Sequence, residues 1–138
     1  MSWINEIVQD LIEKYRTNNP FELADYLNVH VVFWDLHEEV NGFYKYDRRN
    51  KYIIINNNLD ETSQKFTCAH ELGHAKLHPR TNTPFLRKNT FFSTGKIERE
   101  ANEFATYLLL YDKNLEDYET RFDVLKECGV PYEMERFL

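Results

Sequence analysis

The chain has 138 residues, 42% of them hydrophobic and 15% aromatic, which is enough for one core and too short to need two. A net charge of -6 leaves no basic surface to neutralise phosphates, which argues against direct binding of nucleic acid. The sequence lacks a signal-peptide pattern and an apolar run of the roughly 18 to 20 residues that span a membrane. We therefore predict one cytoplasmic domain over residues 1–138 that does not bind membranes, with Cys68 and Cys128 as reduced thiols.

Two helices are expected at the N-terminus. The apolar residues of the first recur at helical spacing and predict an amphipathic helix: Trp3, Ile4, Ile7, Val8, Leu11, Ile12 and Tyr15. Asn19 then supplies an N-cap, Pro20 a first helical residue and Glu22 an acidic third residue. A second, short helix is expected to begin there and to end near Asn28.

A small sheet is expected next. Residues 29–36 are β-branched and aromatic, and the turn at Asn41-Gly42 precedes a second run, GFYKY. A polar turn at residues 47–50 leads to the run from Lys51 to Asn56. These patterns predict about three strands, and the unbroken apolar run of the last one predicts a strand covered on both faces.

The remainder is predicted to be helical around one long loop. Asn58 or Asp60 can cap a buried helix that ends before Pro79, because the residue before a proline is pushed out of the α region. Residues 79–94 show no period, which is typical of a functional loop. A helix with a core stripe at Ile97, Ala101, Phe104 and Leu108 follows, and then another at residues 122–128. The predicted fold class is α+β.

The segment His70-Glu71-Leu72-Gly73-His74 has the spacing of a zinc site. Four residues of α-helix turn through about 400°, so His70 and His74 project from one face and their ring nitrogens can meet at one ion. A catalytic zinc takes three protein ligands, acidifies water and polarises a peptide carbonyl. Glu71, next to the first ligand, is placed to take the proton from that water.

A catalytic zinc site needs a third protein ligand, and the sequence offers few candidates for it. His78 follows His74 too soon for an HExxHxxGxxH arrangement and is interpreted as a packing or outer residue. The later helix carries three candidate carboxylates: Glu98, Glu100 and Glu103. Glu98 is the choice, because it shares a helical face with Asn102, whose amide could bind a metal ligand from behind.

The runs HELGHAKLH and EREANEFATYLLL resemble the ImmA/IrrE family of zinc metallopeptidases, and the resemblance spans roughly residues 20–138. It implies a zincin-like α+β fold with Glu98, which opens the family pattern E-x-x-A-x-x-F-A, as third ligand. It also implies a regulatory role in phages or mobile elements, where members cleave or inactivate a repressor. The chain departs from the family at residues 109–112, Leu-Leu-Tyr-Asp in place of Leu-Leu-Met-Pro, and we expect no appended DNA-binding or sensor domain.

Two functions remain open at this point. The leading hypothesis is an endopeptidase that binds Zn²⁺ through His70, His74 and Glu98, uses Glu71 as general base, and cuts a regulatory protein such as a phage repressor. The alternative is a zinc-stabilised binding module that inactivates its partner by association without cutting it. The sequence does not identify the substrate. Three tyrosines could each donate a hydrogen bond to an oxyanion, and the spacing selects none of them: Tyr44, Tyr52 and Tyr107.

Overall fold

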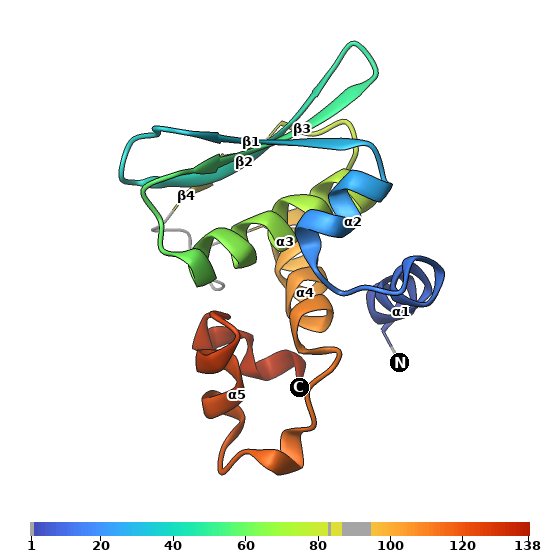
Figure 1. The fold of residues 1–138 in the computed structure, drawn as a ribbon, viewed down its shortest axis with the longest axis vertical. Helices are drawn as coiled ribbons and strands as arrows, with labels where there is room; N and C mark the ends of the chain where they lie inside the picture. The colour runs from blue at the N-terminus through green and yellow to red at the C-terminus, as the bar shows by residue number, and fades with distance from the viewer. Residues whose placement is uncertain (1, 83, 87–94) are drawn as a thin grey trace.

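A twisted sheet lies on one side of the molecule and the helices gather on the other (Figure 1). The structure, a computed structural model, describes residues 2–82, 84–86 and 95–138. The helices are α1 (Trp3–Tyr15), α2 (Pro20–Tyr26), α3 (Glu61–Leu77), α4 (Lys96–Leu110) and α5 (Arg121–Glu127), with 3-10 turns at Leu115–Asp117 and Tyr132–Phe137. The strands are β1 (Val29–Trp34), β2 (Val40–Asp47), β3 (Asn50–Asn56) and β4 (Pro84–Leu86). The α+β prediction is confirmed.

The sheet has the order β1-β3-β2-β4, so β3 is internal. The predicted hairpin joins β2 to β3, and its two turn residues, Arg48 and Arg49, both have positive φ, as a tight two-residue turn requires. β1 pairs in parallel with β3, which the sequence pattern did not reveal. The three predicted strands are present, and β4 adds a short fourth one inside the segment predicted to be a loop. The rest of that loop, residues 83 and 87–94, lies outside the described residues.

The prediction that β3 is covered on both faces is wrong. Ile53 and Ile55 are fully buried on the face toward α3, whereas Ile54, which points the other way, is only partly buried. The packing of α3 is against β2 and β3, and Figure 1 shows the labelled helices on the same side of the sheet. A mixed sheet of this kind tolerates one face toward solvent, so a continuous apolar run did not require a second layer.

Helix α3 lies at the centre of the molecule. Asp60 caps it by accepting a hydrogen bond from the Ser63 backbone N–H at 2.8 Å, and it ends at Leu77, two residues before Pro79. Every residue from Phe66 to Ala75 is buried, because the sheet, α2 and α4 all pack against this helix. The polar residues of its middle turns are therefore held in the interior. None of the helices in the described part of the chain has the length and apolar character needed to cross a membrane.

Gly73 allows α4 to approach α3 closely. A methyl carbon added at Gly73 would lie 3.2 Å from the Cα of Ala101 and 3.2 Å from Cβ of Phe104, which is tighter than ordinary contact. Glu98 lies three residues before Ala101 on α4, so it belongs to the turn adjoining this crossing point. The close approach therefore brings the first turns of α4 over the polar middle of α3.

We expect Gly73→Val to destabilise the protein. Overpacking costs about 1–3 kcal/mol, whereas the better helix propensity of valine returns only about 0.5 kcal/mol. Urea unfolding of the chelator-treated protein should show a lower free energy of unfolding. Gly95→Ser is the control, because an added Cβ at Gly95 meets no atom within 4 Å among the described residues. Equal stability of Gly73→Val and wild type would contradict a close helix crossing.

Candidate metal centre

Two imidazoles and a carboxylate come from consecutive turns of α3. His70 and His74 are four residues apart, and their rings lie edge to face with centroids 4.9 Å apart. Both histidines and the intervening Glu71 are buried, with exposed fractions of 0–1%. One potential ligand atom from each of these three residues lies within 4.8 Å of the others. The helical repeat places His70 and His74 on one face of α3, and Glu71 directly follows His70 in the chain.

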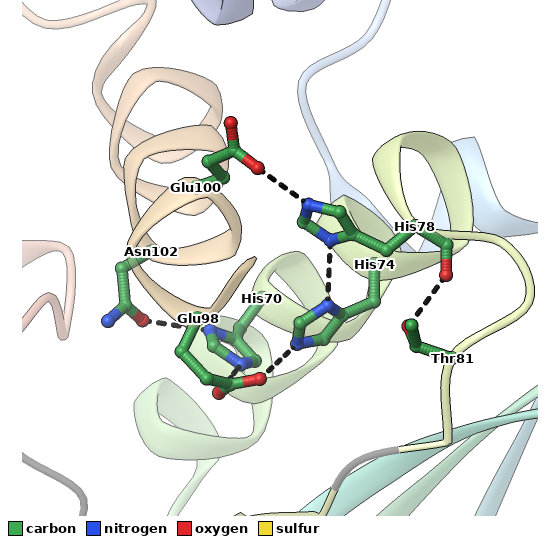
Figure 2. A network of polar contacts seen from close by, with 7 residues as sticks. All are labelled: His70, His74, His78, Thr81, Glu98, Glu100 and Asn102. Atoms are coloured by element: carbon green, nitrogen blue, oxygen red, sulfur yellow. Dashed lines mark hydrogen bonds and ion pairs between the residues drawn. The ribbon is translucent and has the colours of Figure 1, made fainter. Parts of the chain in front are cut away.

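Glu98 of α4 reaches both imidazoles (Figure 2). Its Oε2 lies 3.1 Å from Nε2 of His70, and its Oε1 lies 2.7 Å from Nε2 of His74. The side chain is 8% exposed, so the contacts are shielded from water. Both ring nitrogens that face the carboxylate are Nε2. The three residues predicted as ligands therefore converge in the structure, and ligation itself stays a prediction.

The other two candidate carboxylates of α4 lie elsewhere. Glu100 contacts Nε2 of His78 at 2.9 Å, and Glu103 accepts a hydrogen bond from the Ser2 hydroxyl near the start of α1. His78 itself is an outer residue, since its Nδ1 lies 3.0 Å from Nδ1 of His74. Sequence reasoning missed the pairing of Glu100 with His78, because the pairing depends on how α3 and α4 cross.

Asn102 lies behind His70, as its position one turn after Glu98 predicted. Its Oδ1 is 2.8 Å from Nδ1 of His70, so the amide oxygen can accept the ring proton. The Asn102 amide is buried, and its own backbone carbonyl accepts from the Thr106 hydroxyl at 2.8 Å. Metal-bound histidines commonly have such a partner on the nitrogen that faces away from the ion.

The two buried carboxyl groups are tuned in opposite directions. Burial, reinforced by the nearby charge of Glu98, raises the pKa of Glu71 well above its usual value. Burial also acts to raise the pKa of Glu98, but the contacts with His70 and His74 outweigh it and lower that pKa to about 2. Burial lowers the pKa of His74, which favours the neutral imidazole that binds metals. Two carboxyl groups with separated pKa values in one site are typical of an acid–base pair.

The donor set fits a divalent metal such as zinc. Among the described residues, five buried side-chain atoms have no aligned hydrogen-bond partner, and four of them belong to this site: Glu71 Oε1, Glu71 Oε2, His74 Nε2 and Glu98 Oε1. Nε2 of His74 and Oε1 of Glu98 are only 2.7 Å apart, but their relative orientation is not that of a hydrogen bond. Unpaired buried polar atoms are costly, and a shared cation satisfies them together. Imidazole nitrogens with a carboxylate oxygen are ligands that zinc accepts.

Comparison with known proteins agrees with this geometry. Residues 24–137 match the peptidase M78 family model, described as the IrrE N-terminal-like domain. The chain belongs to the ImmA/IrrE metallopeptidase family. It is 54% identical to immunity region protein 2 of Bacillus phage phi105, over 95% of this chain and 85% of that protein. It is 34% identical to the metallopeptidase ImmA of Bacillus subtilis, over 83% of this chain and 67% of that protein. No solved structure matches it significantly.

The three tyrosines left open as oxyanion donors have other contacts in this ImmA/IrrE domain. Tyr44 is fully buried and its hydroxyl donates to the carbonyl oxygen of Pro79 at 2.6 Å, while burial raises its pKa to about 12. Tyr52 packs against His30, and Tyr107 lies against Phe137. Tyr44 thus joins the sheet to the segment after α3, and the structure assigns no oxyanion donor among these residues.

We expect Glu71→Gln to stabilise the metal-free protein, increasingly so as the pH rises. The raised pKa of Glu71 means that its contribution to stability is complete below the unfolded-state pKa and is lost as the pH rises through the folded-state pKa. Glutamine is neutral at every pH in this range, so the variant loses no stability from this position. Urea unfolding in chelator between about pH 5 and about pH 8 should show the variant's advantage growing. A constant or shrinking advantage would contradict the assigned environment.

Proposed function

We propose that the protein is a zinc-dependent endopeptidase that cuts a regulatory protein. One observation carries the proposal: the carboxylate of Glu98 lies between the Nε2 atoms of His70 and His74, beside the buried Glu71. A purely structural zinc site is normally closed by four protein ligands. Two histidines and Glu98 supply three, which suits a catalytic site with room for water and substrate.

His70, His74 and Glu98 would hold the zinc ion. Their Nε2 atoms and carboxylate already face one another in the interior. Zinc, when bound, supplies Lewis acidity that polarises a peptide carbonyl and lowers the pKa of water. The depressed pKa of Glu98 suits a ligand, because a carboxylate must be ionised to bind a metal.

Glu71 would act as general base and then as general acid. It lies next to His70 in the chain, and burial raises its pKa well above the usual value, which makes its carboxylate a stronger proton acceptor. Its carboxylate would take a proton from water as that water attacks the peptide carbonyl. The same oxygen would then give the proton to the nitrogen of the departing amine, which leaves Glu71 ionised again.

A repressor or similar regulator is the substrate class that the relatives favour. One relative is named as a protein of a phage immunity region, and another as the metallopeptidase ImmA. A peptidase associated with phage immunity has a clear target in the protein that maintains immunity. Such a regulator would be met in the cytoplasm, where we expect this chain to act.

Zinc content should depend on Glu98 and not on Glu71. We expect one zinc per chain, measured by elemental analysis, in both wild type and Glu71→Gln, and a large loss in Glu98→Ala. Glu103→Ala is the matched control, since Glu103 lies on the same helix and contacts Ser2 instead of the histidines. Full zinc content in Glu98→Ala would remove Glu98 from the ligand set.

Turnover should depend on Glu71. The candidate substrate is the repressor encoded in the same genetic element, incubated with the zinc-loaded protein and followed by mass spectrometry. Loss of a general base lowers rates by about 10²–10⁴-fold, so Glu71→Gln should leave the repressor essentially intact. Equal cleavage by both proteins would contradict the assigned base. A stable complex without fragments would instead favour a zinc-stabilised antirepressor that acts by association.

A further inference from the structure

The two ligand-type imidazoles have different partners on their outer nitrogens. Nδ1 of His70 faces the neutral amide oxygen of Asn102 at 2.8 Å. Nδ1 of His74 faces a second imidazole, that of His78, at 3.0 Å, and the other side of that ring contacts Glu100 at 2.9 Å (Figure 2). A carboxylate is therefore linked to His74 through an intervening ring.

The directions of these contacts allow one arrangement of protons when a metal is bound. Nε2 of His74 faces Glu98, so this nitrogen must be unprotonated to bind a metal and Nδ1 must carry the proton. Nδ1 of His78 lies 3.0 Å away and must then offer a lone pair to accept that proton. His78 must then carry its own proton on Nε2, from which it donates to Oε1 of Glu100.

We propose that His78 and Glu100 are positioning residues that set the tautomer and ring orientation of His74 for metal binding. The inference rests on the proposed zinc site. A ligand imidazole whose outer N–H is hydrogen-bonded is held in one orientation and becomes a better donor to the metal. Glu100 strengthens the link, because a hydrogen bond to a charged acceptor is about twice as strong as a neutral one.

The backbone around His78 is held in a way that suits this role. His78 is the C-cap of α3, and its N–H donates to the His74 carbonyl at 2.7 Å. Its own carbonyl accepts from the Thr81 hydroxyl at 2.8 Å and from the Thr81 N–H at 3.1 Å. The next residue, Pro79, accepts the hydrogen bond from Tyr44. These contacts fix the backbone at His78, from which its ring reaches His74 and Glu100.

Both side chains of the pair are well shielded. The His78 side chain is 9% exposed and that of Glu100 is 17% exposed, so their contact is only weakly screened by water. Glu98 and Glu100 come from the first two turns of α4. Glu98 contacts the Nε2 atoms of His70 and His74, and Glu100 contacts the ring of His78. The start of α4 thus contacts His74 from both sides, directly through Glu98 and indirectly through Glu100.

Zinc affinity tests the proposal, measured by competition with a chromophoric chelator. We expect His78→Phe and Glu100→Ala to weaken zinc binding by about 10–100-fold, the usual effect of losing an outer partner. Glu100→Gln should lose less, because its amide oxygen can still accept from Nε2 of His78. Glu103→Ala is the control, and urea unfolding of each chelator-treated variant establishes that it folds.

Nitrogen NMR of the zinc-loaded protein gives a readout that a merely structural role would not change. Nδ1 of His74 should carry a proton protected from exchange with water in wild type, and this protection should be lost in Glu100→Ala and in His78→Phe. If the wild-type protein binds no zinc, the proposed function itself fails. If it binds zinc and the folded Glu100→Ala protein binds it equally, with the same proton protection, only the positioning role is overturned.

Discussion

The structure depends above all on one contact. Where α3 and α4 cross, the Glu98 carboxylate of α4 meets the His70 and His74 imidazoles of α3. Both Nε2 atoms lie within 3.1 Å of a carboxylate oxygen in a buried setting. Burying a charged group is unfavourable unless partners compensate for lost hydration, so the helices must approach closely enough to provide them. Gly73 and Ala101 permit that approach because neither has a bulky side chain at the crossing. Close packing of α3 against α4 and the convergence of the candidate metal ligands therefore require the same short distance between the two helices.

The same burial divides the work between two carboxyl groups. Glu98 has imidazole partners and its pKa falls, whereas Glu71 has none among the described residues and its pKa rises. Sequence position alone would treat them as similar acids. Their environments favour the ionised form of Glu98, which suits holding a cation, and make the carboxylate of Glu71 a stronger proton acceptor. This separation gives the proposed peptidase a ligand and a base from the same residue type.

The sheet and the segment after α3 shield and support the histidines of the candidate metal centre. β2 and β3 cover one side of α3, so the turns that carry His70 and His74 are shielded from water, and Tyr44 joins the sheet to Pro79. That tie supports the position of His78, whose ring links His74 to Glu100. A rigid support for the ligands matters because a metal site tolerates only small errors in the position of its donors. The fold thus contributes on the side away from α4 as well.

Short-range pattern determined the parts of this protein that depend on a single element. The i, i+4 spacing of His70 and His74, a cap at Asn58 or Asp60 and the hairpin of β2 and β3 follow from local geometry and could be predicted, and the structure places the cap at Asp60. The facial position of Glu98 with Asn102 also follows from the helical repeat. The parallel pairing of β1 with β3, the short β4 and the link from Glu100 to His78 could not be predicted, because each depends on how separate elements pack. Only the tertiary structure decided that Glu98 meets both His70 and His74 while Glu100 meets His78, since these contacts depend on the close crossing of α3 and α4 at Gly73.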